Sequence, residues 1–182
     1  MAAIQPLSNL WPHLWLLSDA RNDDALEQAL RRLPRGSGLI YRHYHLSPEK
    51  RVARFDMLAR IARSRGHLVV LADSALTARE WGADGIYGAP LSLYPRRDGL
   101  LRLATAHSLV EIAQARRVGA HAVLLSPAFT TQSHPGAPSL GPVRWRLLAA
   151  RAGMPVIALG GMNSCTAQRL KWPHWAAIDG LS

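Results

Sequence analysis

HAVLLSPAFTTQSHPGAPSLGPVRWRLLAARAGMPVIALGGMN, residues 121–163, is the stretch that decides the fold of this chain. It contains two short apolar runs, Ala122–Leu125 and Val156–Leu159, and each is followed by small polar residues or by glycine. Apolar runs of this length, bounded by turn-forming residues, are typical of buried β-strands. A helical pattern lies between them, around Trp145–Arg151. The stretch therefore predicts a strand–helix–strand unit with polar residues where the strands end.

The same strand–helix unit recurs along the rest of the chain. Apolar runs predict strands at Leu14–Ser18, Leu39–Tyr41, Leu68–Ala72, Gly85–Tyr87, Leu101–Ala104, Ala122–Leu125, Val156–Leu159 and Trp175–Ile178. Helices are expected between most of them, and their predicted N-terminal caps are Asn22 or Asp23, Ser47, Ser108 and Ser164. Residues 88–99 are an exception, because Pro90 and Pro95 prevent a regular helix there.

Repeated strand–helix units form either an open doubly wound sheet or a closed barrel. The number of units favours the barrel. We therefore predict a single domain over residues 1–182, of the α/β class, with a (β/α)8 TIM-barrel fold. The barrel is expected to be reduced, with helix 4 and helix 8 short or missing.

Composition limits the class of protein. The 182 residues carry a formal net charge of +10, from 22 Lys and Arg against 12 Asp and Glu. The basic residues are spread along the chain without interleaved aromatic residues, which argues against nucleic acid and favours a general attraction for small anions. No apolar run approaches about 18 residues, and the N-terminus lacks a signal-peptide pattern. We therefore expect a cytoplasmic protein with no membrane partner.

In a (β/α)8 barrel the active site lies at the carboxyl ends of the strands, which we call the barrel mouth. This rule selects the residues at or just beyond the ends of the predicted strands: Asp19, Arg42, Asp73, Tyr87, Thr105, His107, Ser126–His134, Gly160, Gly161, Asp179 and Gly180. The loop after the sixth strand offers Thr, Ser and His donors to a phosphate. Gly160 and Gly161 either turn backbone N–H groups toward an anion or allow close packing.

Three charged or titratable residues of the mouth have two interpretations each. Arg42 either clamps a phosphate or carboxylate or forms an ion pair across the mouth. Asp73 either supplies one oxygen ligand to Mg²⁺ or caps the next helix. His107 is the candidate acid–base group because an imidazole titrates near neutrality, although a lone histidine is often structural. The lone Cys165 excludes a Cys-based zinc site, and we expect no zinc site among the histidines.

Four segments carry a more specific signal. LLSPAFTTQSHPGAPSLG (residues 124–141) and PVIALGGM (155–162) are similar to the motifs G-P-V-F-x-T-x-[ST]-K-P-x-x-P-x-L-G and P-V-x-A-I-G-G-[IM] of the thiamine-phosphate synthase/TenI superfamily. AREWGADGIY (78–87) and ATAHSLVEIAQARRVGA (104–120) resemble two further segments of that superfamily, in the same order. The resemblance covers most of the chain. It implies a (β/α)8 barrel that acts on thiazole-phosphate compounds in thiamine biosynthesis.

The chain departs from the synthase pattern around the diphosphate site. The synthase expels the diphosphate of an aminopyrimidine with the help of Mg²⁺, which requires dense positive charge. Of the family's Q-x-R-x-K motif only Arg42 is kept, and Asp73 is the one retained metal ligand. His134 replaces the loop lysine, and Thr105 replaces a serine. TenI proteins also lack parts of that site, and they use the histidine matched by His107 to move a proton during thiazole aromatisation.

The resemblance is closest to a reduced TenI-like branch. We expect an enzyme of this family, a transferase or a thiazole tautomerase, that binds a thiazole phosphate or a related anion. The resemblance implies His107 as the catalytic residue, Asp73 as the metal candidate, and as binding residues Arg42, Thr105, Ser126, Thr131, Ser133, His134, Gly160 and Gly161.

Two alternative functions stay open, an active synthase and a non-catalytic phosphate-binding or regulatory barrel. Mg²⁺ is required only if synthase activity is retained, and no other cofactor is expected. The missing helices leave apolar surface for a partner or for a second subunit of a homo-oligomer.

Overall fold

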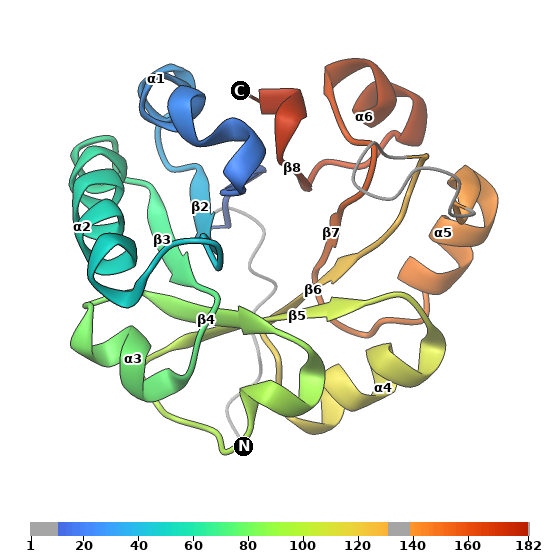
Figure 1. Cartoon of the computed structure of the whole chain (residues 1–182). Helices are drawn as coiled ribbons and strands as arrows, with labels where there is room; N and C mark the ends of the chain where they lie inside the picture. The colour runs from blue at the N-terminus through green and yellow to red at the C-terminus, as the bar shows by residue number, and fades with distance from the viewer. Residues whose placement is uncertain (1–10, 131–138, 182) are drawn as a thin grey trace.

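A computed structural model describes residues 11–130 and 139–181, and Figure 1 shows them as a ring of strands surrounded by helices. Each strand pairs in parallel with the next one in the chain, and β8 pairs with β1, which closes the barrel. The strands are β1 Leu14–Leu17, β2 Gly38–Tyr41, β3 Leu68–Leu71, β4 Gly85–Gly88, β5 Leu101–Ala106, β6 Ala122–Leu125, β7 Val156–Ala158 and β8 Trp175–Ala177. The predicted (β/α)8 fold is confirmed.

The helices pack on the outside of the barrel (Figure 1). They are α1 Leu26–Arg32, α2 Pro48–Ser64, α3 Ala75–Glu80, α4 Leu109–Arg117, α5 Gly141–Ala149 and α6 Ser164–Leu170. Within the described residues, β4 is followed only by the 3-10 helix η2, Pro90–Leu93, and β8 only by the 3-10 helix η3, Asp179–Leu181. The prediction of a short or missing helix 4 is therefore confirmed, and the described barrel has fewer than eight α-helices.

Two of the predicted helix caps are wrong. Asp19, rather than Asn22 or Asp23, caps the 3-10 helix η1 (Ala20–Ala25), and Asn163, rather than Ser164, caps α6. A capping residue needs extended backbone so that its side-chain oxygen reaches an amide in the first turn. Both observed caps meet this requirement, with φ and ψ of −152° and 161° at Asp19 and −153° and −178° at Asn163. Ser108 caps α4 as predicted.

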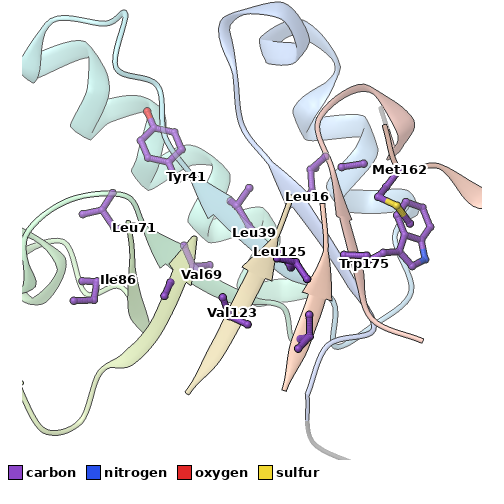
Figure 2. Packing of buried hydrophobic residues seen from close by; sticks show 14 of the residues in the cluster. Leu16, Leu39, Tyr41, Val69, Leu71, Ile86, Val123, Leu125, Met162 and Trp175 are labelled. Carbon is purple, nitrogen blue, oxygen red and sulfur yellow. The ribbon is translucent and has the colours of Figure 1, made fainter. Parts of the chain in front are cut away.

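Side chains alternate between the barrel interior and the layer beneath the helices, as the pleat of a strand requires. Figure 2 shows the outer layer, where Leu16, Leu39 and Val69 belong to the cluster that packs under the helices. Their chain neighbours fill the interior instead, and the buried residues there are Trp15, Leu17, Ile40, Val70, Leu103, Ala122, Leu124, Ile157 and Ala176. This alternation fixes which residues beyond each strand continue the inner face.

One glycine makes the interior packing feasible. Trp15 is fully buried, and a Cβ atom added at Gly38 would lie 2.2 Å from its Cε3 atom. Gly38 is the partner of Trp15 in the pairing of β1 with β2, so the indole occupies the space that the absent side chain leaves.

None of the described helices is long and apolar enough to cross a membrane.

Candidate functional site

Three of the expected site residues continue the inner face of the barrel toward the mouth. Arg42, Thr105 and Ser126 each lie two residues after a side chain of the interior cluster. Side chains on one face of a strand recur every second residue, so these three residues share the face that lines the mouth. The strand ends thus bring together a guanidinium and two hydroxyl groups from β2, β5 and β6.

Arg42 forms the ion pair across the mouth that was one of its two interpretations. Its Nη2 lies 3.3 Å from Asp19 Oδ2, and Asp19 also pairs with Arg21 at 2.9 Å. Burial by itself raises the pKa of the Asp19 carboxyl, but the two arginines outweigh burial and hold the pKa below its usual value. Asp19 therefore stays ionised and holds Arg42 at the rim of the barrel.

Tyr87 adds a phenol to the same mouth. Its ring packs against the interior cluster, and burial raises the pKa of its hydroxyl to about 12 although the nearby positive charge of Arg42 opposes the shift. The phenol therefore stays protonated and offers a hydrogen-bond donor at neutral pH.

The surroundings of Asp73 do not fit a Mg²⁺ site. Its Oδ2 accepts a hydrogen bond from Arg51 at 2.5 Å, and its Oδ1 accepts the amide hydrogen of Ser74 at 2.7 Å. Burial raises the pKa of this carboxyl, but these hydrogen bonds outweigh burial and the net shift is downward. A Mg²⁺ ion is held by free carboxylate oxygens together with substrate phosphates. Here a guanidinium occupies the position beside the carboxylate where such an ion would bind.

Arg51 is fixed in that position by several elements. It projects from α2, and its guanidinium also donates to the backbone oxygens of Arg42 at 3.1 Å and Ala72 at 3.1 Å. The rings of Tyr44 and Trp81 flank it, with centroids 5.6 and 5.3 Å from its Cζ. Arg51 thus joins the carboxyl ends of β2 and β3.

His107 lies at the end of β5 with one ring nitrogen engaged. Its Nδ1 is 2.9 Å from the backbone oxygen of Ser126 and 3.1 Å from the Ser126 hydroxyl. A carbonyl oxygen only accepts, so Nδ1 carries the hydrogen and donates it. Nε2 makes no hydrogen bond with any residue that the structure describes, and the side chain is exposed. The arrangement leaves Nε2 available to exchange a proton with a molecule in the mouth.

Gly160 and Gly161 show the close packing that was one of their two interpretations. Their φ angles are +89° and +63°. A Cβ at Gly160 would lie 2.7 Å from the Pro127 Cα, and one at Gly161 would lie 2.3 Å from the Thr130 backbone oxygen. The two glycines therefore let the loop after β7 lie against the loop after β6. Three further predicted residues, Thr131, Ser133 and His134, lie outside the described residues.

Asn22 is a residue of the mouth whose role the sequence did not indicate. It was predicted only as a possible helix cap, yet its side chain is buried and donates to the backbone oxygens of Leu17 at 3.1 Å and Ile178 at 2.9 Å. These bonds tie the end of β1 to the end of β8, where the barrel closes. Arg51 was likewise unassigned, because nothing in the spacing of an arginine within α2 shows that it reaches β3.

The closed parallel barrel with polar and charged side chains at its mouth defines a TIM-barrel protein. The chain belongs to the thiamine monophosphate synthase family, TMP-TENI, whose family model matches residues 14–178. This membership places it in a family of thiamine biosynthesis whose named synthases are transferases, and the expected family is confirmed.

Similar proteins with assigned names agree with this placement. The chain is 29% identical over 148 residues to a thiamine-phosphate synthase of Chloroflexus aurantiacus, covering 78% of this chain and 67% of that protein. It is 29% identical over 174 residues to a thiamine-phosphate synthase of Synechococcus sp., covering 87% of this chain and 48% of that protein. The chain thus spans about half to two thirds of these two relatives.

Solved structures show the same fold. A thiamine phosphate pyrophosphorylase from Pyrococcus furiosus superposes with a TM-score of 0.77 at 21% identity, covering 95% of this chain and 88% of that chain. FabK from Thermotoga maritima superposes with a TM-score of 0.73 at 15% identity, covering 96% of this chain and 61% of that chain. At these identities the likeness shows a shared barrel fold.

Proposed function

We propose that this chain binds a thiazole phosphate at the barrel mouth and transfers a proton on the thiazole ring through His107. The observation that carries the proposal is the hydrogen bond from His107 Nδ1 to the Ser126 backbone oxygen, at 2.9 Å. This bond fixes the orientation of the imidazole and keeps Nε2 as the nitrogen that exchanges a proton with the ligand.

The proton transfer needs no other reactant. In the neutral ring, Nε2 takes a proton from one carbon of the non-aromatic thiazole tautomer and returns it to another carbon, so that the ring becomes aromatic. During the transfer the imidazole is positively charged, and the Ser126 carbonyl dipole stabilises that charge through the Nδ1–H bond. Positioned acid–base groups of this kind contribute about 10²- to 10⁴-fold in rate.

Arg42 and the hydroxyl groups beside it would hold the phosphate. A guanidinium binds a phosphate through two parallel hydrogen bonds, and Arg42 already lies at the rim with its charge shared with Asp19. Thr105, Ser126 and the phenol of Tyr87 offer neutral donors on the same inner face. Thr131, Ser133, His134 and the backbone amides of Gly160 and Gly161 stay predictions of the phosphate site.

The hydrogen bonds of Asp73 favour proton transfer over the synthase reaction. Expelling a diphosphate requires a metal ion or a comparable density of positive charge at the leaving group. The guanidinium of Arg51 neutralises Asp73 instead, so the one metal ligand that the resemblance retains is not free to hold that ion. The proposed ligand is accordingly a monophosphate that carries a thiazole ring.

Three assays on the purified chain test the proposal. Calorimetry measures binding of thiazole phosphate, proton NMR in D₂O follows the conversion of the thiazole tautomer, and a third assay combines aminopyrimidine diphosphate, thiazole phosphate and Mg²⁺. We expect binding and conversion, with no thiamine phosphate formed. His107→Gln should lower the conversion rate by about 10²-fold or more while binding is retained.

The matched control is His13→Gln, an exposed histidine that precedes β1 at the opposite end of the barrel. This variant should convert the tautomer at the wild-type rate. Formation of thiamine phosphate would instead show that the chain is a synthase. Absence of binding to both thiazole phosphate and thiamine phosphate would overturn the proposal and leave a barrel for a different ligand.

A further inference from the structure

A second polar cluster lies on the rim of the barrel, between η1 and the segment that follows β2. It consists of Asp23, His43 and His45, whose possible ligand atoms all lie within 4.8 Å of one another. Among the described residues it is the one group of three or more His, Cys, Asp or Glu side chains with this property. The prediction of no zinc site overlooked that a single residue separates His43 from His45.

His43 is rigidly held within the cluster. Its side chain is fully buried, its ring stacks on Tyr41 with the centroids 4.7 Å apart, and its Nδ1 lies 2.7 Å from the Ser18 hydroxyl. Histidine ligands of metals are oriented in this way by a hydrogen bond to the ring nitrogen that does not bind the metal. The contact with Ser18 therefore leaves Nε2 as the ligand atom, and Nε2 faces Asp23 Oδ1 at 2.8 Å.

The carboxylate of Asp23 is also oriented in advance. Arg54 donates from Nε to Asp23 Oδ1 at 2.8 Å and from Nη2 to the Asp23 backbone oxygen at 2.7 Å. The same guanidinium binds Glu27 at 2.8 Å, so two carboxylates share its positive charge. Asp23 Oδ2 makes no hydrogen bond or ion pair with the described residues, which leaves it free to bind a cation.

His45 is the member of the cluster that the hydrogen-bond chain does not need. Its side chain is exposed, its ring centroid is 5.0 Å from that of His43, and it makes no hydrogen bond within the described part of the chain. Zinc ligands lie about 2.0–2.2 Å from the ion, which places them closer together than the 4.8 Å that bounds this cluster, so one side chain must adjust when an ion binds. An exposed side chain makes this adjustment by rotating about its own bonds.

We propose that Asp23, His43 and His45 bind a Zn²⁺-type transition-metal ion, with a water molecule in the fourth position. Two imidazoles and one carboxylate are a ligand set of open zinc sites. Imidazole nitrogen favours Zn²⁺, Ni²⁺ and Cu²⁺ over Mg²⁺, so this site differs in chemistry from Asp73. The ion links η1 to the segment after β2, and its binding does not depend on the proposed reaction of His107.

The test measures Zn²⁺ affinity by competition with a chromophoric chelator, in a Cys165→Ser background because Cys165 is exposed. His45→Asn removes one ligand at an exposed position. The matched control is His13→Asn, because His13 and His174 form another close histidine pair, with ring centroids 4.8 Å apart. We expect one Zn²⁺ per chain and an affinity that His45→Asn lowers by roughly 10- to 100-fold or more, while His13→Asn leaves it unchanged.

Spectroscopy and a second variant separate ligation from folding. Co²⁺ in the same site should give the visible absorption bands of a four-coordinate ion, and these bands should disappear in both His45→Asn and Asp23→Asn. Circular dichroism of the metal-free His45→Asn variant should match that of the parent. The proposal is overturned if His45→Asn binds Zn²⁺ as tightly as the parent, or if His13→Asn alone abolishes binding.

Discussion

The close approach of Gly38 to Trp15 leads to a prediction about the stability of the barrel. In Gly38→Ala, the new Cβ would lie 2.2, 2.4 and 2.6 Å from three carbons of the Trp15 indole. These separations are far below a normal carbon–carbon contact of about 3.5–4.0 Å. Trp15 is fully buried in the barrel interior, where its ring is packed among the side chains of the interior cluster.

The expected cost follows from two opposing effects. Overpacking a well-filled core costs about 1–3 kcal/mol, and the severity of this overlap places it at the upper end. Replacing a strand glycine with alanine recovers roughly 0.5–1 kcal/mol of conformational entropy. The net loss should therefore be about 2 kcal/mol, which lowers the melting temperature of a chain of this size by about 4–8 °C.

Urea denaturation followed by circular dichroism measures this loss, and a double-mutant cycle identifies its cause. Trp15→Phe removes Cε3 and Cζ3, the two closest of these atoms, so Gly38→Ala should cost less in the Trp15→Phe background. Gly88→Ala is the matched control, because the nearest contact of its Cβ is the flexible hydroxyl of Ser92. Equal costs of Gly38→Ala in both backgrounds, or a neutral Gly38→Ala, would refute the packing argument.

Three other predictions concern a buried histidine, a loop glycine and a buried amide. Burial lowers the pKa of His67, and its Nδ1 accepts the amide hydrogen of Ser37 at 3.1 Å. The unfolded state therefore binds more protons than the folded state. The free energy of unfolding should fall as the pH drops below 6.5, the ordinary pKa of histidine in the unfolded chain. His67→Gln should reduce this pH dependence in urea titrations at several pH values; an unchanged slope would contradict the assignment. Gly161→Ala should destabilise the chain by about 1–3 kcal/mol, because φ at this position is +63° and the new Cβ would lie 2.3 Å from the Thr130 backbone oxygen. An unchanged melting temperature would show that the loop moves to accept the new side chain. Asn22→Ala should lower the free energy of unfolding, measured in urea, by about 2–3 kcal/mol, because the backbone oxygens of Leu17 and Ile178 lose the buried amide that donates to them. A loss below about 0.5 kcal/mol would mean that water replaces the amide.

The strand pattern shows how far local sequence determines the barrel. Each predicted strand appears within two residues of its expected bounds, because a short apolar run between turn residues has few other ways to be buried. Pro90 and Pro95 correctly indicated the missing fourth helix, since proline removes a helical hydrogen bond. The caps were less predictable, because several Asx or Ser residues precede η1 and α6 and only backbone geometry selects Asp19 and Asn163.

The sequence predicted which residues lie at the candidate site, but only some of the contacts that their side chains make. Arg42 and Ser126 directly follow strands and Thr105 lies near the end of β5, and strand alternation alone places all three on the inner face of the mouth. The sequence left two interpretations of Arg42 open, and the structure shows the ion pair with Asp19. For Asp73, only the folded chain reveals that Arg51 neutralises it.

The sequence by itself indicated the eight strands, the absence of a regular helix after the fourth strand and the residues at the strand ends, since each follows from local periodicity and from the proline and glycine residues between elements. The tertiary structure decided which side chains meet. Arg51 reaches Asp73 across 22 residues, His43 reaches Asp23 across 20, and Asn22 reaches Ile178 across 156. These contacts depend on the curvature and register of the closed sheet, and no local pattern in the chain encodes the distance between two strand ends once the barrel has closed.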